Sequence, residues 1–421
     1  MKIALVSRSV YPLHGYGGLE RHVHDLARAL IERDASVTLI TRPPSEDRES
    51  DASAIHPALR VEYVPYRTFP LAGRRGTTVI DRSTAYPIFG MRAGRRALAL
   101  VRSAQADIVH GLGASVLGYA RVRGSAASPA GAHGGATAPL VFNPQGLEEF
   151  GATDPARARL KRAAYLPLRR AVLACATAAD AVIATDTALE PVVLRHLKIP
   201  QAKMRTIPNA LDLHAIDAMT DPGAIGELRR KHDLAAAERV LLSVGRLEAS
   251  KGFHVLLRAL AAARDHGSLE GAEWRWVVLG DGPYRPVLEM LAMELGLERR
   301  VHFLGRVQDR EMHAWHEVST LFVHPTLYEG SSLVTLEAMA HRRAVVASAA
   351  GGIPDKVRPG VNGWLVTPGD PSALAGAISG ALSDLSRLAH YGVGGRAIVE
   401  REFSWAAAGD TTLALYRELL G

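Results

Sequence analysis

Short apolar runs alternate along the whole chain with longer segments in which apolar residues recur every three or four positions. The short runs have the length of strands, and the longer segments have the periodicity of amphipathic helices. In the first half the expected strands are 2–7, 37–41, 61–66, 107–111, 140–143 and 181–185. In the second half they are 240–244, 275–279, 301–304, 321–324, 344–348 and 363–366. Strands that alternate with helices predict doubly wound α/β domains.

A segment rich in proline and aspartate, near 208–222, separates two halves that share this alternating pattern. A chain of 421 residues is long enough for two domains, each with a core of its own. We therefore expect a domain boundary in this segment. A second segment, 124–138, is rich in glycine, alanine and serine and predicts a loop.

Two glutamates bracket a short polar segment after one of the expected strands. Glu329 follows the strand 321–324, and Glu337 lies in a helix expected over 332–341. Ligands of open α/β sheets bind outside the carboxyl ends of the strands. The segment Gly330-Ser331-Ser332 offers backbone N–H groups at a helix N-terminus, and carboxylates accept hydrogen bonds from paired hydroxyls. The pattern indicates a site for a sugar or ribose with a phosphate.

Two further expected strands are followed by basic residues or by glycines. Arg246 and Lys251 lie between the strand 240–244 and the next helix, where a diphosphate could be held. The sequence Gly15-Tyr16-Gly17-Gly18-Leu19-Glu20 follows the first strand, and glycines let a backbone approach a phosphate or sugar. For the two basic residues, a solvated surface position is the alternative interpretation.

Six motifs follow one another over nearly the whole chain. They are Gly15 to Glu20, Ile207-Pro208-Asn209-Ala210-Leu211-Asp212, Gly245-Arg246-Leu247 with Lys251-Gly252, Gly280-Asp281-Gly282-Pro283, Glu329 with Glu337, and Gly351-Gly352-Ile353-Pro354-Asp355. Together they resemble the retaining glycosyltransferases of family 4 (glycosyl transferases group 1). The resemblance implies the GT-B fold, an α/β architecture of two Rossmann-like domains whose parallel sheets face a central cleft. It implies an acceptor-binding domain of residues 1–212 with 402–421 and a donor-binding domain of residues 213–401.

The resemblance also implies an activity, that of a hexosyltransferase. The enzyme would move a hexose-type sugar from a nucleotide diphosphate sugar to a hydroxyl acceptor, with retention at the anomeric carbon. The acceptor would be a glycan, lipid or small molecule, lipid-linked or anionic acceptors included, as in cell-envelope or polysaccharide synthesis. No metal or other cofactor is expected, because Arg246, Lys251 and helix N-termini can neutralise the leaving diphosphate. A phosphorylase or sugar-nucleotide epimerase of the same fold stays open as the alternative.

The motifs carry roles over to individual residues of this chain. Arg246 and Lys251 would hold the diphosphate, Glu337 the ribose hydroxyls and Glu329 the donor sugar. Further donor contacts are expected from backbone at Ser331, Ser332, Leu333 and Val334, from backbone near Arg306-Val307 at the nucleobase, and from Gly17 and Gly18 in the other domain.

A histidine completes the expected catalytic set. His110 ends the strand 107–111, where the family often has a sugar-contacting histidine, although Leu112 stands where a second histidine is common. The catalytic residues are then expected to be His110, Arg246, Lys251 and Glu329. A buried structural histidine is the alternative interpretation of His110.

Other classes of protein fit the residues less well. An oxidoreductase with a dinucleotide fold needs a third glycine where Glu20 stands, and an acid near the position of Arg42. A retaining glycosidase needs two carboxyls about 5–5.5 Å apart. Eight residues of mostly helical rise, at about 1.5 Å each, separate Glu329 and Glu337 by about twice that distance. A sugar-binding module without catalysis would not need Arg246 and Lys251.

The composition is that of a globular protein with an excess of basic residues. Hydrophobic residues make up 48% and charged residues 22% of the chain, and the net charge is +7. The excess gathers in the first half, at Arg67, Arg74, Arg75, Arg82, Arg92, Arg95, Arg96, Arg157, Arg159, Lys161, Arg162, Arg169 and Arg170. An anionic acceptor, an anionic membrane surface or plain solvation would each account for it. A nucleic-acid partner is not expected, because no aromatic-studded basic strand accompanies the charge.

Cysteine usage and the start of the chain bear on its location. Cys175 is the single cysteine and cannot form an internal disulfide, which is typical of a reducing compartment. Met1-Lys2 runs directly into the first expected strand, leaving no room for a signal peptide. We therefore expect a cytoplasmic protein, with peripheral contact at the inner face of an anionic membrane as one option.

Overall fold

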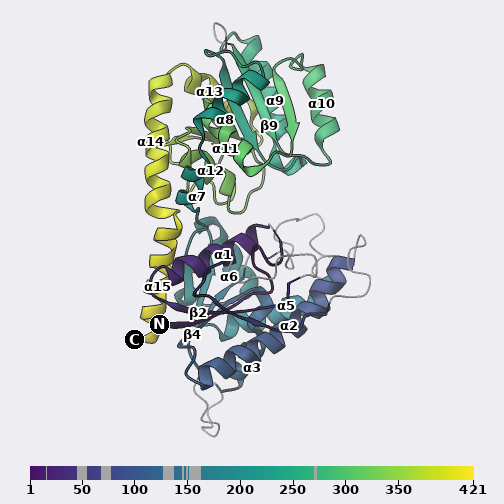
Figure 1. Ribbon diagram of the computed structural model, residues 1–421. Helices are drawn as coiled ribbons and strands as arrows, with labels where there is room; N and C mark the ends of the chain where they lie inside the picture. The colour runs from purple at the N-terminus through teal and green to yellow at the C-terminus, as the bar shows by residue number, and fades with distance from the viewer. Residues whose placement is uncertain are drawn as a thin grey trace. The chain divides into compact units, whose positions relative to one another are not determined.

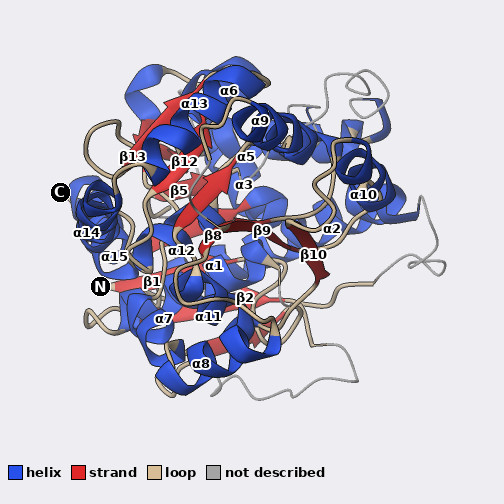
Figure 2. Ribbon diagram, turned by 90° about the horizontal axis from the view of Figure 1, so that it is seen from above, coloured by secondary structure: helices blue, strands red, loops and turns tan. Residues whose placement is uncertain are grey.

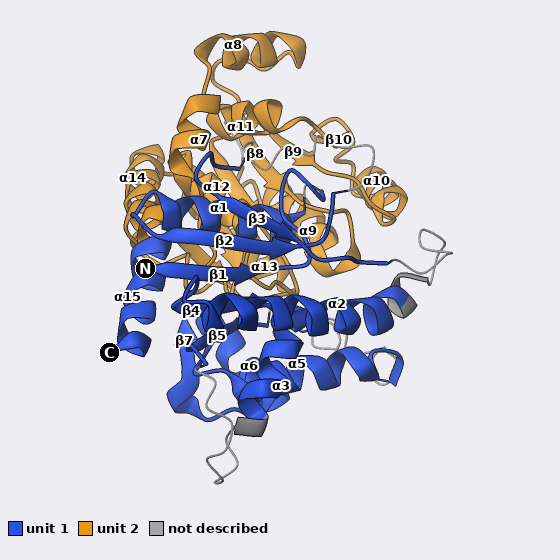
Figure 3. Cartoon of the chain, turned by 60° about the horizontal axis from the view of Figure 1, so that its bottom comes forward, with its two compact units in different colours: residues 1–208, 408–421 blue, residues 209–407 orange. Residues whose placement is uncertain are grey.

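The chain folds into two compact units, residues 1–208 with 408–421 (unit 1) and residues 209–407 (unit 2) (Figure 3). The computed structural model describes residues 1–15, 17–44, 55–67, 77–126, 137–144, 147, 150, 163–269 and 273–421. Figure 1 shows the path of the chain, with the N-terminus and the C-terminus both in unit 1. Each unit is built around a parallel sheet of its own.

Unit 1 contains a parallel sheet that includes the first strand of the chain. In spatial order, its described strands are β3 (Arg60–Tyr63), β2 (Ser36–Thr41), β1 (Lys2–Val6), β4 (Ile108–Leu112), β5 (Leu140–Asn143), β6 (Ala181–Ala184) and β7 (Met204–Thr206). Ile3 pairs with Val37 of β2 on one side and with Ile108 of β4 on the other. The strand order reverses between β1 and β4, the topological switch point where doubly wound sheets bind ligands.

Helices alternate with these strands and cover the sheet (Figure 2). The first, α1 (Gly18–Ile31), buries Val23, Leu26, Ala27 and Leu30, the spacing of one helix face. A shared apolar core joins β1, β4, β5 and β6 to the helices α2 (Thr77–Arg102), α3 (Leu117–Ala126), α5 (Leu166–Ala178) and α6 (Glu190–Leu197).

The last helix, α15 (Trp405–Leu420), returns to unit 1 from residue 408 onward. Arg33 forms an ion pair with Asp410 at 2.6 Å, and Arg205 forms one with Glu418 at 2.6 Å. Tyr416 is fully buried against β4. The end of the chain is therefore part of the core of unit 1.

Unit 2 has the same kind of parallel sheet. In spatial order, its strands are β10 (Val301–Gly305), β9 (Trp274–Leu279), β8 (Arg239–Val244), β11 (Leu321–His324), β12 (Val345–Ser348) and β13 (Gly363–Val366). Leu321 and Phe322 of β11 pair with Leu241 and Leu242 of β8. The order reverses between β8 and β11, so the loops after these two strands meet at the switch point.

The side chains of this sheet alternate between two apolar cores, one on each face. Leu241 and Val323 point to one core, whereas Leu242 and Phe322 point to the other. The helices of the unit are α7 (Leu213–Met219), α8 (Pro222–Lys231), α9 (Phe253–Asp265), α10 (Arg285–Glu294), α11 (Asp309–Val318), α12 (Leu333–Ala340), α13 (Pro371–Leu382) and α14 (Leu385–Glu402). Because both faces are covered, the strands are nearly continuous apolar runs.

The two parallel α/β sheets and all twelve expected strands are confirmed, with three corrections. The strand expected over 61–66 ends at Tyr63, ahead of Val64 and Pro65. The short strand β7, Met204–Thr206, is not predicted from its sequence, because Arg205 and Thr206 interrupt the apolar pattern. The loop expected over 124–138 begins later, since α3 extends to Ala126; residues 127–136 lie outside the described part. Among the described residues, no helix combines the length and apolar character that crossing a membrane requires.

Candidate active site

Two loops at the carboxyl edge of unit 2 are held against each other. Residues 245–252 follow β8, and residues 325–332 follow β11. The Leu327 N–H donates a hydrogen bond to the Ser250 carbonyl at 2.8 Å, and the Thr326 hydroxyl donates to the same carbonyl at 3.2 Å. Gly252 has φ +67°, and a Cβ there would lie 1.9 Å from the carbonyl oxygen of Pro325. Only glycine lets the backbones approach this closely.

These loops bring Lys251 and Glu329 into direct contact. The Lys251 ammonium donates to Glu329 Oε2 at 2.8 Å, and the two side chains are 21% and 13% exposed. His324, the last residue of β11, lies 2.9 Å from the same oxygen through Nε2 and is 1% exposed. The second oxygen, Oε1, accepts a hydrogen bond from the Gly330 N–H at 3.2 Å.

The charge state of Glu329 follows from these contacts. Burial by itself raises the pKa of a carboxyl, because it penalises the charged form. The hydrogen bond from His324 and the positive charge of Lys251 outweigh the burial and lower the pKa of Glu329 to about 2. Glu329 is therefore a carboxylate at every physiological pH.

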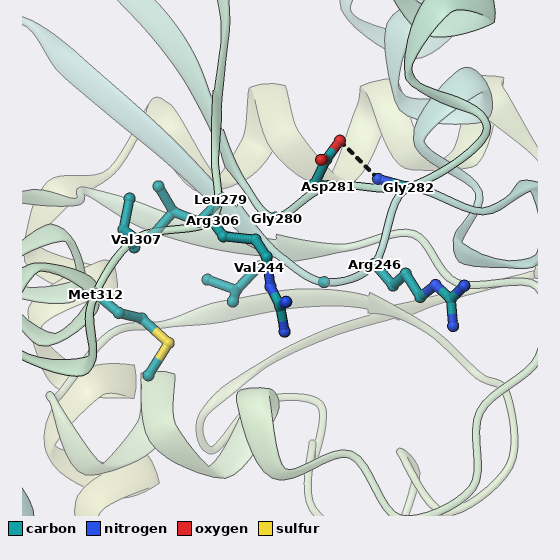
Figure 4. Close-up of a pocket in the computed structure, with 10 residues that line it drawn as sticks. Val244, Arg246, Leu279, Gly280, Asp281, Gly282, Arg306, Val307 and Met312 are labelled. Atoms are coloured by element: carbon teal, nitrogen blue, oxygen red, sulfur yellow. Dashed lines mark hydrogen bonds between the residues drawn. The ribbon is translucent and has the colours of Figure 1, made fainter. Parts of the chain in front are cut away.

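Arg246 has a different environment from that of Lys251. Its side chain is 69% exposed, and its guanidinium pairs with Glu248 at 3.0 Å. Figure 4 shows Arg246 at one end of a cavity of 560 Å³ that also contains the expected nucleobase contact Val307. The other lining residues are Val244, Gly245, Leu279, Gly280, Asp281, Gly282, Arg306 and Met312. The structure thus places Arg246 and Val307 at one cavity and Lys251 at the half-buried carboxylate of Glu329.

The helix α12 begins directly after this loop and carries Glu337. Ser332 is its N-cap, with the hydroxyl accepting from the Thr335 N–H at 3.4 Å. The Ser332 side chain is buried, whereas Ser331, Leu333, Val334 and Glu337 are half-buried. The expected helix over 332–341 is confirmed to within one residue at each end.

A third loop, Gly351 to Lys356, supports the loop that carries Glu329. Gly351 has φ +53°, and a Cβ there would lie 1.8 Å from the Glu329 carbonyl oxygen. The Gly352 N–H donates to the Gly330 carbonyl at 3.1 Å. The fully buried Lys356 donates in turn to the Gly352 carbonyl at 3.0 Å. Sequence reasoning missed both Lys356 and His324, since a single basic residue beside an apolar run carries no local signal of its partner.

The remaining expected site residues lie in unit 1. Gly17 is the N-cap of α1 and Gly18 its first residue; a Cβ on Gly18 would meet nothing within 4 Å, so its surface is open. Their contact with a donor stays a prediction. Tyr16, between them and Gly15, lies outside the described residues.

His110 lies in β4 and has the surroundings of a core histidine. It is 1% exposed, and Nδ1 lies 2.6 Å from the Tyr416 hydroxyl. Burial, together with a smaller effect from His22, lowers the pKa of His110 to about 3, so the ring is neutral. These surroundings favour the interpretation of His110 as a buried structural histidine. Its contact with a sugar stays a prediction.

Comparison with protein families gives two matches. Residues 16–215 match the model described as Glycosyltransferase Family 4, and residues 238–384 match the one described as Glycosyl transferases group 1. A D-inositol 3-phosphate glycosyltransferase of Xylanimonas cellulosilytica is 28% identical, over 99% of this chain and 96% of its own. An uncharacterized glycosyltransferase of Methanocaldococcus jannaschii is 29% identical over 57% of this chain, a match that spans 61% of that protein.

Solved structures show the same fold over the full chain. Sucrose-phosphate synthase from Thermosynechococcus elongatus superposes with a TM-score of 0.72 at 24% identity, covering 99% of this chain and 98% of its own. HepE of Anabaena in complex with UDP superposes with a TM-score of 0.69 at 21% identity, covering 99% of this chain and 100% of its own.

Proposed function

This chain belongs to the family 4 (group 1) glycosyltransferases, and from that premise we propose that it moves a hexose-type sugar from a nucleotide diphosphate sugar to a hydroxyl acceptor, with retention and without a metal. The observation that carries the proposal is the contact between Lys251 and Glu329 at the switch point of unit 2. A cation held in place by a half-buried carboxylate is positioned for a diphosphate before any ligand binds. UDP in the HepE structure supports a nucleotide diphosphate as the ligand class.

The residues divide the binding of the donor between them. Lys251 has three donor positions, so it can contact a phosphate oxygen while Glu329 still holds it. Arg246 would meet the diphosphate from the open side, with the nucleobase in the cavity beside Val307. Glu337 on α12 would accept from the ribose hydroxyls, and the backbone of residues 331–334 lies next to it. Glu329 keeps acceptor capacity at Oε1 for a hydroxyl of the sugar.

In a transfer with retention, the diphosphate leaves from the same face of the sugar that the acceptor oxygen attacks. The bond from the anomeric carbon to the diphosphate oxygen breaks, and the bond to the acceptor oxygen forms on the same face. The proton of the acceptor hydroxyl passes to the leaving diphosphate oxygen. Lys251 and Arg246 stabilise the negative charge that develops there, which is the role that a metal ion would otherwise fill.

A panel of nucleotide sugars tests the proposal. Turnover of one donor, with the sugar linked to a hydroxyl acceptor in the same anomeric configuration, is the expected result. The alternatives give other products: a phosphorylase forms a sugar 1-phosphate from inorganic phosphate, and an epimerase forms an isomeric sugar or sugar nucleotide. Chelating metals should leave the rate unchanged.

The proposed contact between Glu337 and the ribose is tested separately, by measuring the affinity for the nucleoside diphosphate alone. Glu337→Ala removes the acceptor for the ribose hydroxyls, and we expect at least a tenfold loss of affinity, since hydrogen bonds to charged groups contribute about 1.5–3 kcal/mol. Glu289→Ala, a glutamate on α10 in a surface pair with Arg285, is the control. If Glu337→Ala and Glu289→Ala bound the nucleoside diphosphate equally well, Glu337 would not be a ribose contact.

A further inference from the structure

Two arginines with no carboxylate partner lie at the carboxyl edge of the unit 1 sheet. Arg8 follows β1 and Arg42 follows β2, the neighbouring strand. Tyr66 follows β3, the next strand along, and Tyr86 lies on α2. We call these four residues the Arg8–Arg42 cluster. Figure 3 shows β1 and β2 side by side in unit 1.

The two guanidinium groups gather around the same aromatic ring. Arg8 lies 5.9 Å from the centre of the Tyr66 ring and 4.8 Å from that of Tyr86, and Arg42 lies 5.5 Å from that of Tyr66. Both arginines are half-buried. The rings hold the cations by cation–π attraction, and Arg8 Nη1 also donates to the Tyr66 hydroxyl at 3.5 Å. A guanidinium has five N–H donors, so the others remain for an acceptor.

The nearby acids, Asp81 and Glu20, offset part of the positive charge of Arg42 but give their hydrogen bonds to other groups. Asp81 accepts a hydrogen bond from the Tyr66 hydroxyl at 2.7 Å, and Glu20 accepts one from Ser9 at 2.9 Å. Within the described part of the chain, neither Arg8 nor Arg42 forms an ion pair, and Arg42 Nε is buried without a hydrogen-bond partner. Most other half-buried arginines of the described part, such as Arg33, Arg123 and Arg275, do have a carboxylate partner.

The like charges oppose each other in the absence of a ligand. Burial, and then the charge of Arg8, lower the pKa of Arg42 below its usual value. Keeping two guanidinium groups together in a half-buried place is unfavourable unless an anion joins them. Guanidinium forks match the geometry of phosphate and carboxylate oxygens. The donor diphosphate has its own cations in unit 2, so this second basic site fits another molecule.

We propose that the Arg8–Arg42 cluster binds the anionic group, a phosphate or a carboxylate, of the acceptor. The proposal rests on the proposed function, because it assigns the acceptor of that reaction to the chemical class of anionic hydroxyl compounds. The aromatic rings would line the site next to the anion, where the apolar face of a sugar or cyclitol can pack.

Titration of the full chain with D-glucose 6-phosphate, inorganic phosphate and D-glucose tests the site. We expect the two anions to bind and neutral glucose not to bind. Arg8→Gln and Arg42→Gln should each weaken anion binding by about tenfold to a hundredfold, the effect of losing a charge-assisted contact. Arg60→Gln, the same charge change on an exposed residue at the amino end of β3, should have no effect.

Further variants separate this site from the donor site and from a loss of folding. Lys251→Ala should leave anion binding intact, and Arg8→Gln should leave the affinity for nucleoside diphosphates intact. Arg8→Lys keeps a cation between the two rings but loses the fork, so it should fold and retain part of the binding. A wild type that binds no nucleoside diphosphate would refute the proposed function, whatever the result with anions.

Vesicles distinguish a free anion from a lipid headgroup. Pelleting with phosphatidylinositol in phosphatidylcholine, lost in Arg8→Gln and kept in Arg60→Gln, would identify a headgroup; binding of the soluble anions alone would identify a free acceptor. Three results would overturn the proposal: no anion binding by the wild type, equal binding by Arg8→Gln and Arg60→Gln, or loss of anion binding in Lys251→Ala.

Discussion

Lys251 and Arg246 follow the same strand but differ in what surrounds them. Lys251 is held by the half-buried carboxylate of Glu329, whereas Arg246 is exposed beside Glu248. A fixed cation in a desolvated place stabilises a developing charge more than an exposed one that water screens. We expect Lys251→Ala to lower kcat/KM by about 100- to 1000-fold and Arg246→Ala by about tenfold. Steady-state kinetics decide this, with Lys231→Ala, an exposed lysine paired with Glu311, as the unaffected control.

Glu329 is expected to act largely through Lys251. If its main task is to hold that ammonium, the double variant Lys251→Ala with Glu329→Ala should be no slower than Lys251→Ala alone. Independent roles would instead make the two losses in kcat/KM multiply. A multiplicative result would assign Glu329 to the donor sugar directly, as its motif position implies.

At the scale of elements, Gly252 joins the loops after β8 and β11. A methyl group there would collide with the Pro325 carbonyl, and the backbone has a left-handed φ that other residues adopt only with strain. We expect Gly252→Ala to separate Lys251 from Glu329 and lower both the unfolding midpoint and kcat/KM. Gly376→Ala on α13 is the matched control: a Cβ there meets nothing within 4 Å, so the change should stabilise by about 0.5–1 kcal/mol. Unchanged turnover in Gly252→Ala would contradict this account.

Helices α11 and α12 meet at a group of buried histidines. His341 follows α12 and binds His313 at 2.7 Å and Glu317 at 2.6 Å. His316 is fully buried and stacks on His341 at 5.3 Å. Burial, the neighbouring histidines and Arg343 lower the pKa of His316 well below 6.5.

A lowered histidine pKa gives a stability that depends on pH in a definite direction. The unfolded chain takes up the proton of His316 near pH 6.5 and the folded chain does not, so this contribution is complete above pH 6.5 and is lost as the pH falls below it. We expect the free energy of unfolding to fall more steeply between pH 6.5 and 4.5 in the wild type than in His316→Phe. If the free energy of unfolding fell equally with pH in the wild type and in His316→Phe, His316 would not be the source of the pH dependence.

At the scale of the whole molecule, the excess of basic residues in the first half of the chain could bind the protein to an anionic membrane. Arg74, Arg75, Arg157, Arg159, Lys161 and Arg162 lie outside the described residues. Among the others, Arg96 pairs with Glu62, while Arg92 and Arg95 on α2 are exposed. Each exposed basic residue near an anionic leaflet contributes about 1 kcal/mol to binding.

We therefore expect the protein to pellet with anionic vesicles at low salt. The binding should fade as the Debye length shortens from about 10 Å at 0.1 M to about 3 Å at 1 M. The double variant Arg92→Gln with Arg95→Gln should bind less than Arg258→Gln with Arg299→Gln, the same change of charge on exposed residues of unit 2. Failure to pellet at low salt would leave the basic residues as a solvated surface.

The pattern of apolar and polar residues was sufficient for the strands, the two-sheet architecture and the site segments. Strand and helix periodicity is a local property, and strands that alternate with helices form parallel, doubly wound sheets. The order of the strands in each sheet comes from the structure. The six motifs, read in order, were likewise enough for the family, whereas the roles that they give to Lys251, Glu329 and Glu337 stay predictions.

Only the tertiary structure decided which side chains face one another. In the sequence, His324 is only the end of an apolar strand. The fold places it against Glu329, which also pairs with Lys251, 78 positions away. His110 ends an apolar strand in the sequence, and only the fold shows that it lies against Tyr416, 306 positions away. Arg8 and Arg42 come together because β1 and β2 are neighbours. Burial and charge pairing depend on contacts between distant segments, and no local pattern records them.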